Sequence, residues 1–134
     1  MSTFNHIRLE LAREPGHPHG DPRTGWDIVA ALDDEGNLDL SGCRQDPGRC
    51  RVRRFTRDAT IATGRLRHRG DADWVFDLQP DEGLDDAGYR LGSNRFVLGD
   101  TVSIVSPDGV AHIYGVERLQ ALVDDAPETV EPFD

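Results

Sequence analysis

The feature that most constrains the fold is a period-two alternation of apolar and polar residues, which recurs in short segments along the chain. In the first segment, Ile7, Leu9 and Leu11 alternate with polar residues, and the same spacing recurs at residues 26–32 and 49–56. Successive side chains of a β-strand point to opposite faces. Each segment therefore predicts a strand with one buried face.

Turn signals separate these segments. Residues 14–25 hold three prolines and three glycines and predict a loop, and Pro-Asp-Gly at 107–109 predicts the turn of a hairpin. Strands are predicted at residues 6–11, 26–32, 49–56, 60–69 and 74–78 and on both arms of a hairpin within 95–116, with short helical turns within 39–48 and at 117–123. About seven short strands predict an all-β fold, namely a small antiparallel barrel of the SH3-like or OB-like kind, because a closed barrel hides its sheet edges. A two-sheet sandwich is the alternative.

The length of 134 residues suits one domain with a modest core. We expect a single barrel domain at residues 1–123 and a disordered acidic tail at residues 124–134. No apolar run approaches the roughly 18 residues that cross a bilayer, and no secretion signal is recognisable at the start of the sequence. A cytoplasmic protein is therefore expected, with Cys43 and Cys50 as reduced thiols, although the sequence leaves a disulfide between them open.

Charge is distributed unevenly along the chain, whose formal net charge is -10. Residues 44–70 carry nine arginines and two acidic residues, so this segment has a net charge of +7 between two acidic segments. All 15 basic residues are arginine, whose planar guanidinium pairs bidentately with carboxylates and phosphates. The basic segment is therefore the first place to look for an anion-binding surface.

Alternation along two adjacent strands predicts that Arg51 and Arg53 share a face with Arg65 and Arg67. If Arg53 lies opposite Arg65, like charges meet across the hairpin, and such pairs destabilise a sheet unless anions are near. Two interpretations follow. The protein's own Asp73 and Asp77, on the next strand, could neutralise this face, with Arg69 opposite Asp73 and Arg65 opposite Asp77. Alternatively, the face could bind the carboxylates or phosphates of a partner.

Other candidate sites lie outside the basic segment. A loop carries His17, His19 and Asp21, and His112 and Tyr114 lie on a predicted strand. The spacing of the histidines and of the two cysteines does not match structural zinc sites, and residues 80–86 do not match a calcium loop, so no metal is expected. The sequence contains no recognisable catalytic or nucleotide-binding motif, and no cofactor is expected.

Several short motifs are spread over residues 4–118, namely CRVRRF, GRLRHR, WVFD, GYRLGSNRFVLGDTVSI and HIYGV. In these motifs the chain resembles a family of short bacterial proteins that occurs mainly in proteobacteria. The resemblance implies no activity, cofactor or partner, because no function is assigned to that family.

The predicted function is a small binding module that uses Arg51, Arg53, Arg65 and Arg67 to contact an anionic partner, either an acidic protein or a phosphorylated ligand. Nucleic acid is not expected as a partner, because most of the acidic surface would repel phosphates. The alternative is a ligand-binding barrel or enzyme with a site near the His17–His19 loop, His112 and Tyr114. A third hypothesis is that the acidic tail docks on a basic protein.

Overall fold

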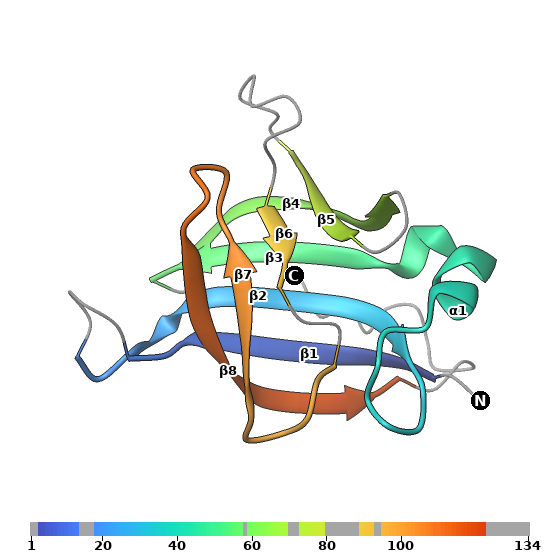
Figure 1. Cartoon of the computed structure of the whole chain (residues 1–134), viewed down its shortest axis with the longest axis horizontal. Helices are drawn as coiled ribbons and strands as arrows, with labels where there is room; N and C mark the ends of the chain where they lie inside the picture. Colours follow the sequence, from blue (N-terminus) through green and yellow to red (C-terminus); the bar gives the residue numbers. More distant parts are fainter. Residues whose placement is uncertain are drawn as a thin grey trace.

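Eight β-strands close into one antiparallel barrel, in which each strand pairs with the next and β8 pairs back with β1 (Figure 1). The computed structural model describes residues 3–13, 18–57, 59–69, 73–79, 89–92 and 95–122. The strands are β1 Thr3–Leu11, β2 Asp21–Leu32, β3 Arg51–Thr56, β4 Ala59–Arg69, β5 Asp73–Gln79, β6 Tyr89–Leu91, β7 Thr101–Val105 and β8 Ala111–Ala121, and the helices are α1 Leu40–Gln45 and the 3-10 helix η1 Pro47–Arg49.

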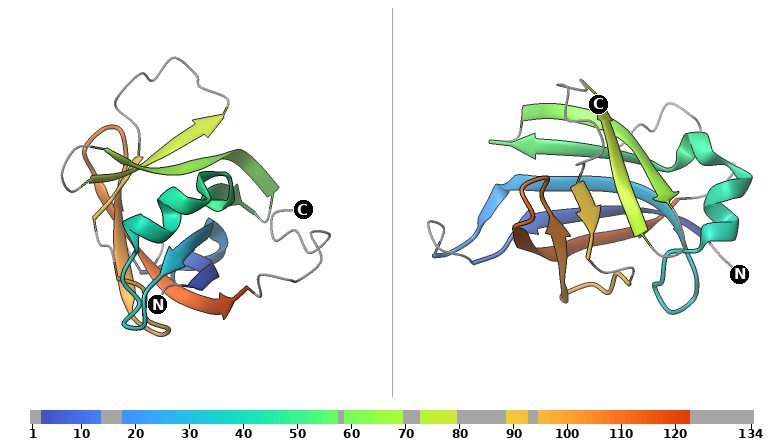
Figure 2. Two further views of the ribbon diagram at one scale, coloured as in Figure 1. Left: turned by 90° about the vertical axis from the view of Figure 1, so that its right-hand side faces the viewer. Right: turned by 45° about the horizontal axis from the view of Figure 1, so that its top comes forward.

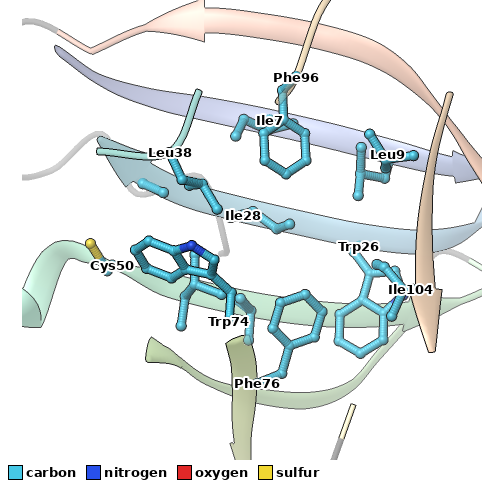
Figure 3. Packing of buried hydrophobic residues seen from close by; sticks show 14 of the residues in the cluster. Ile7, Leu9, Trp26, Ile28, Leu38, Cys50, Trp74, Phe76, Phe96 and Ile104 are labelled. Atoms are coloured by element: carbon cyan, nitrogen blue, oxygen red, sulfur yellow. The ribbon is translucent and has the colours of Figure 1, made fainter. Parts of the chain in front are cut away.

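Alternation of side chains builds the barrel interior. Ile7 and Leu9 of β1 and Trp26 and Ile28 of β2 are fully buried and belong to one hydrophobic cluster with Val52 of β3. Figure 3 shows the packing of this cluster, in which side chains from different strands lie within one interior. Burial of these apolar side chains is the main favourable contribution to folding.

One end of the barrel is covered by α1 (Figure 2, left). The helix begins after Asp39, whose side chain accepts a hydrogen bond from the Ser41 amide and so caps the helix. Cys43 of α1, Leu38 and Phe96 are buried in the hydrophobic cluster. We call this the closed end of the barrel.

The opposite end of the barrel, which we call the far end, is formed by the C-terminal ends of the odd-numbered strands and the N-terminal ends of the even-numbered strands. Because all neighbours are antiparallel, these strand ends meet at one side of the barrel. They are Leu11, Asp21, Thr56, Ala59, Gln79, Tyr89, Val105 and Ala111.

The predicted all-β class and small antiparallel barrel are confirmed. The barrel has eight strands, because Tyr89–Leu91 forms the additional short strand β6 between β5 and β7. The hairpin around residues 107–109 and the helical turn after Asp39 are confirmed. The helical turn predicted at 117–123 is wrong, because β8 continues as a strand to Ala121 and pairs with β1.

The predicted tail at 124–134 lies outside the described residues, and so do the loop at 80–86 and His17. Within the described part of the chain, no helix has the length and apolarity to cross a membrane.

Candidate functional site

The register of the β3–β4 hairpin places Arg51, Arg53, Arg65 and Arg67 on the outer face of the barrel, because Val52 and Leu66 between them are buried inside. The predicted shared face is therefore present. The predicted pairing of Arg53 with Arg65 is wrong by two residues, since Arg65 lies opposite Arg51 and Arg53 lies opposite Thr63. The difference starts at the turn, because Thr56 pairs directly with Ala59, which makes the connection tighter than predicted. The register shift between Arg54 and Phe55, where β4 carries an extra residue, recovers only one residue of that difference.

Asp27 is the main anion of this outer face. Its carboxylate accepts a hydrogen bond from Nη1 of Arg53 at 2.8 Å and lies 2.8 Å from Nε2 of His6, while Nη1 of Arg8 is 3.9 Å away. Asp27 is only 1% exposed, and cross-strand pairing puts it directly between Arg8 and Arg53. Arg53 therefore already has an internal carboxylate as its partner. Its Nε also donates a hydrogen bond to the Thr60 hydroxyl.

Phe55 lies beneath the same arginines. Its ring is fully buried, with the Arg8 guanidinium 4.3 Å and the Arg53 guanidinium 5.3 Å from the ring centroid. The opposing residue on β2 is Gly25, where a Cβ would meet the Leu9 carbonyl oxygen at 1.9 Å. Only glycine fits this close backbone approach. Cation–π contacts thus add to the ion pairs in fixing Arg8 and Arg53.

Strand β5, which was predicted to neutralise the arginines, supplies a weaker ion pair than Asp27 does. As predicted, Arg65 lies opposite Asp77 and Arg69 lies opposite Asp73 in the strand register. The ion pair with Asp77 is made instead by Arg67, whose Nη1 donates to the Asp77 carboxylate at 3.0 Å. Both side chains of that pair are about half or more exposed, at 65% and 49%, so its contribution to stability is small.

Arg54 differs from its neighbours because it points into the barrel. It follows the inward-facing Val52 by two residues and pairs with Trp26 on β2 and with Ala62 on β4. Its Nη1 donates a hydrogen bond to the Tyr89 hydroxyl at 2.5 Å, and its guanidinium lies 5.0 Å from the Tyr89 ring and 5.9 Å from the Trp26 ring. Among the described residues, no carboxylate contacts this guanidinium.

The indole of Trp26 packs beside Arg54 and Tyr89. Its ring packs 4.7 Å from Phe76 and 5.1 Å from Tyr89, and the side chain is fully buried. Its Nε1–H is a buried donor without a hydrogen-bond partner in the described structure. A buried donor that remains unpaired lowers the stability of a protein by about 1–3 kcal/mol. The Trp26 N–H is therefore suited to donate to an acceptor atom of a ligand.

The described residues of the second predicted site also lie toward the far end. His112 and Tyr114 lie near the start of β8, and His19 precedes β2, so strand order places all three toward the far end. His112 is half-buried, Tyr114 is buried, and His19 is exposed. The half-buried Arg54 and Tyr89 face the interior toward this same end.

A second group of titratable side chains lies at the closed end. Cys43 and Cys50 are both buried free thiols. The hydrogen bond from Cys50 lowers the pKa of Cys43, and the same hydrogen bond together with burial raises the pKa of Cys50. In the described parts of the chain, no cluster of three or more histidine, cysteine or acidic side chains could hold a metal ion.

The sequence contained the signal for Arg54, because simple alternation from Val52 places it inside, next to the predicted core. It gave no comparable signal for Tyr89, which follows an acidic segment, or for the position of Asp27 between two arginines. These contacts join positions that are 35 and 26 residues apart in sequence.

No protein-family model, no curated protein and no solved structure matches the chain. The resemblance of its motifs to a bacterial family therefore stays a prediction.

Proposed function

We propose that the protein is a small-molecule-binding barrel whose far end takes one organic anion, with Arg54 as the charge partner and the Tyr89 hydroxyl and Trp26 Nε1–H as further donors. An interior of eight strands is wide enough either to be filled by side chains or to hold one small ligand. The hydrophobic cluster reaches both ends of the barrel, and the half-buried Arg54 and Tyr89 are the polar groups proposed to receive the ligand.

The observation that carries the proposal is a guanidinium held inside the barrel without a carboxylate among the described residues. Removing a charged group from water is unfavourable unless a counter-charge is provided. Proteins retain such unfavourable groups mainly where function needs them. A ligand carboxylate would provide the counter-charge, and the aromatic rings of Trp26 and Tyr89 would contact a planar or apolar body.

The test is a thermal-shift screen of organic carboxylates against the wild type and Arg54→Met. At least one carboxylate with a planar apolar body is expected to raise the melting temperature of the wild type and not that of R54M. Tyr89→Phe is expected to weaken the affinity for that carboxylate by about 10- to 100-fold, since one hydrogen bond to a charged group contributes about 1.5–3 kcal/mol.

The matched control is Arg90→Met. Arg90 adjoins Tyr89 on β6 but is exposed, so R90M should respond like the wild type. An equal response of R54M and the wild type would exclude Arg54 as the charge partner.

A second candidate function uses the outer arginine face to contact an acidic protein or a phosphorylated ligand. The observation that favours it is the direct opposition of Arg51 and Arg65 on neighbouring strands, because two like charges facing each other favour an anion between them. Titration with polyglutamate should then move the backbone amide resonances of residues 51 and 65, and the double variant R51Q/R65Q should abolish binding. Movement of the resonances around Arg54 instead would assign the anion to the far end.

A further inference from the structure

The outer face of β1 to β3 carries a buried apolar residue toward the closed end of the barrel. Val29 of β2 is 2% exposed but does not belong to the hydrophobic cluster of the interior. It alternates with Ile28 and Ala30, which are both in that cluster, so its side chain points outward. Its neighbours across the sheet are His6 on β1 and Arg51 on β3. An apolar side chain on the outside of a barrel is buried only where other groups lie over it.

Arginines lie around Val29 on this face. Arg51 lies opposite Arg65 of β4, and the Nε atom of Arg51 is buried. The guanidinium of Arg49 lies 4.3 Å from the centroid of the Phe4 ring, and Phe4 is half-buried. The described carboxylates of this part of the sheet, on β2 and β5, bind other arginines. We call Phe4, Val29, Arg49, Arg51 and Arg65 the outer basic patch.

The chain returns to this patch at the end of β8. The amide of Leu122 donates a hydrogen bond to the Phe4 carbonyl at 2.8 Å, so the residues that follow leave the barrel beside the patch. Residues 124–134 contain five acidic residues, no basic residue, and the apolar residues Val130 and Phe133. Neighbouring strands lie about 4.8 Å apart, which puts β4 about 15 Å from β1, and about five extended residues span that distance.

We propose that residues 124–134 bind to the outer basic patch of their own barrel, with their carboxylates against the three arginines and Phe133 over Val29. Two arginines that face each other on neighbouring strands favour an anion between them, and the acidic segment supplies it. Guanidinium groups form strong, often bidentate hydrogen bonds with carboxylates. The segment therefore matches both the charge of the patch and its apolar centre.

The covalent connection favours this occupant over a separate molecule. A segment tethered at Leu122 has an effective concentration in the millimolar range, so weak contacts are sufficient. A second copy of the chain also carries a net charge of -10, and the repulsion between copies opposes binding in trans. The bound segment would compete with an acidic partner for Arg51 and Arg65, and this last consequence rests on the second candidate function.

The experiment compares ¹⁵N NMR spectra of the wild-type chain of 134 residues and of a tail variant in which every acidic side chain of residues 124–134 is neutralised. The substitutions are Asp124→Asn, Asp125→Asn, Glu128→Gln, Glu131→Gln and Asp134→Asn. The backbone amide signals of Val29, Arg51 and Arg65 are expected to shift in the tail variant, whereas the signal of Gly109, in the β7–β8 turn, should stay in place. The wild type should also show NOEs between the Phe133 ring and the Val29 methyl groups.

The matched control neutralises two exposed carboxylates elsewhere, with Asp100→Asn before β7 and Glu117→Gln on β8. In this control, the amide signals of Val29, Arg51 and Arg65 should remain at their wild-type positions.

Two results would overturn the proposal. The three amide signals could stay unchanged in the tail variant, or the wild-type NOEs could weaken on dilution, which would assign the contact to separate molecules.

Polyglutamate separates the proposal from the second candidate function. Competition predicts that polyglutamate binds the tail variant about tenfold more tightly than the wild type, because the tail no longer occupies the patch. Amide shifts in the tail variant without polyglutamate binding to either protein would support tail binding and contradict the second candidate function.

Discussion

Asp27 lies on the outer face of β2, is 1% exposed, and contacts His6 and Arg53 at 2.8 Å. It provides the internal counter-charge for part of the arginine-rich strand β3. Arg53 therefore needs no anion from outside the protein. The same observation removes Arg53 from the predicted interaction face, and Arg67 likewise has a carboxylate in Asp77.

Replacing Asp27 by Asn should lower the free energy of unfolding by about 3 kcal/mol, because a buried ion pair that loses one partner leaves an uncompensated charge. Asp77→Asn is the matched control, and its effect should stay below about 1 kcal/mol because the Arg67–Asp77 pair is exposed. Urea denaturation of the two variants measures both values. Equal losses would contradict the assignment of Asp27 as the main internal anion.

At the scale of single elements, the β7–β8 hairpin depends on its turn. Gly109 has a φ of 87°, and its amide donates to the Ser106 carbonyl. Gly109→Ala should therefore cost about 1 kcal/mol of stability, because a side chain disfavours this backbone conformation.

The control is Gly48→Ala in η1, which should be neutral or slightly stabilising, since no atom lies within 4 Å of the added Cβ and no left-handed φ is required. Thermal unfolding of both variants checks this, and a loss in G48A as large as that in G109A would contradict the account.

The elements also show what the sequence could predict. Alternation located β1, β2 and the β3–β4–β5 strands, because each buries one face in a shared core. It failed for residues 117–121, where Leu119 belongs to β8 although Leu119 and Leu122 have helical spacing. The pairing of β8 with β1 contains a register shift between Arg8 and Leu9 of β1. The three-residue strand β6 is too short to show a period, although it supplies Tyr89. Both the strand at residues 117–121 and the short strand β6 form because they pair with strands elsewhere in the barrel. The local sequence pattern does not encode such pairing.

At the scale of the whole molecule, the barrel separates three chemical features. The outer face of β1 to β3 holds Arg8 and Arg53 around Asp27, the closed end holds the two thiols, and the interior toward the far end holds Arg54. Only the last of these presents a charge that lacks a described counter-charge. This difference is the reason for assigning ligand binding to Arg54.

If Arg54 serves binding, its removal should not destabilise the folded protein. The melting temperature of R54M should equal or exceed that of the wild type, because methionine fills similar space without a charge to desolvate. Differential scanning calorimetry of R54M and R90M measures this. A fall of more than about 5 °C in R54M alone would instead make Arg54 a structural residue.

The most direct test of the binding site follows the indole N–H resonance of Trp26 in ¹⁵N-labelled protein during a titration with benzoate, a planar carboxylate. The chain has two tryptophans, so the Trp74 indole serves as an internal reference at another position in the core. Binding at the far end predicts a saturable shift of the Trp26 signal, with a Kd of about 1 mM for so small a ligand, a Trp74 signal that moves less, and no saturable shift of Trp26 in R54M. A Trp26 signal that does not move, or that moves equally in R54M, would contradict the proposal that Arg54 and Trp26 form an anion-binding site inside the barrel.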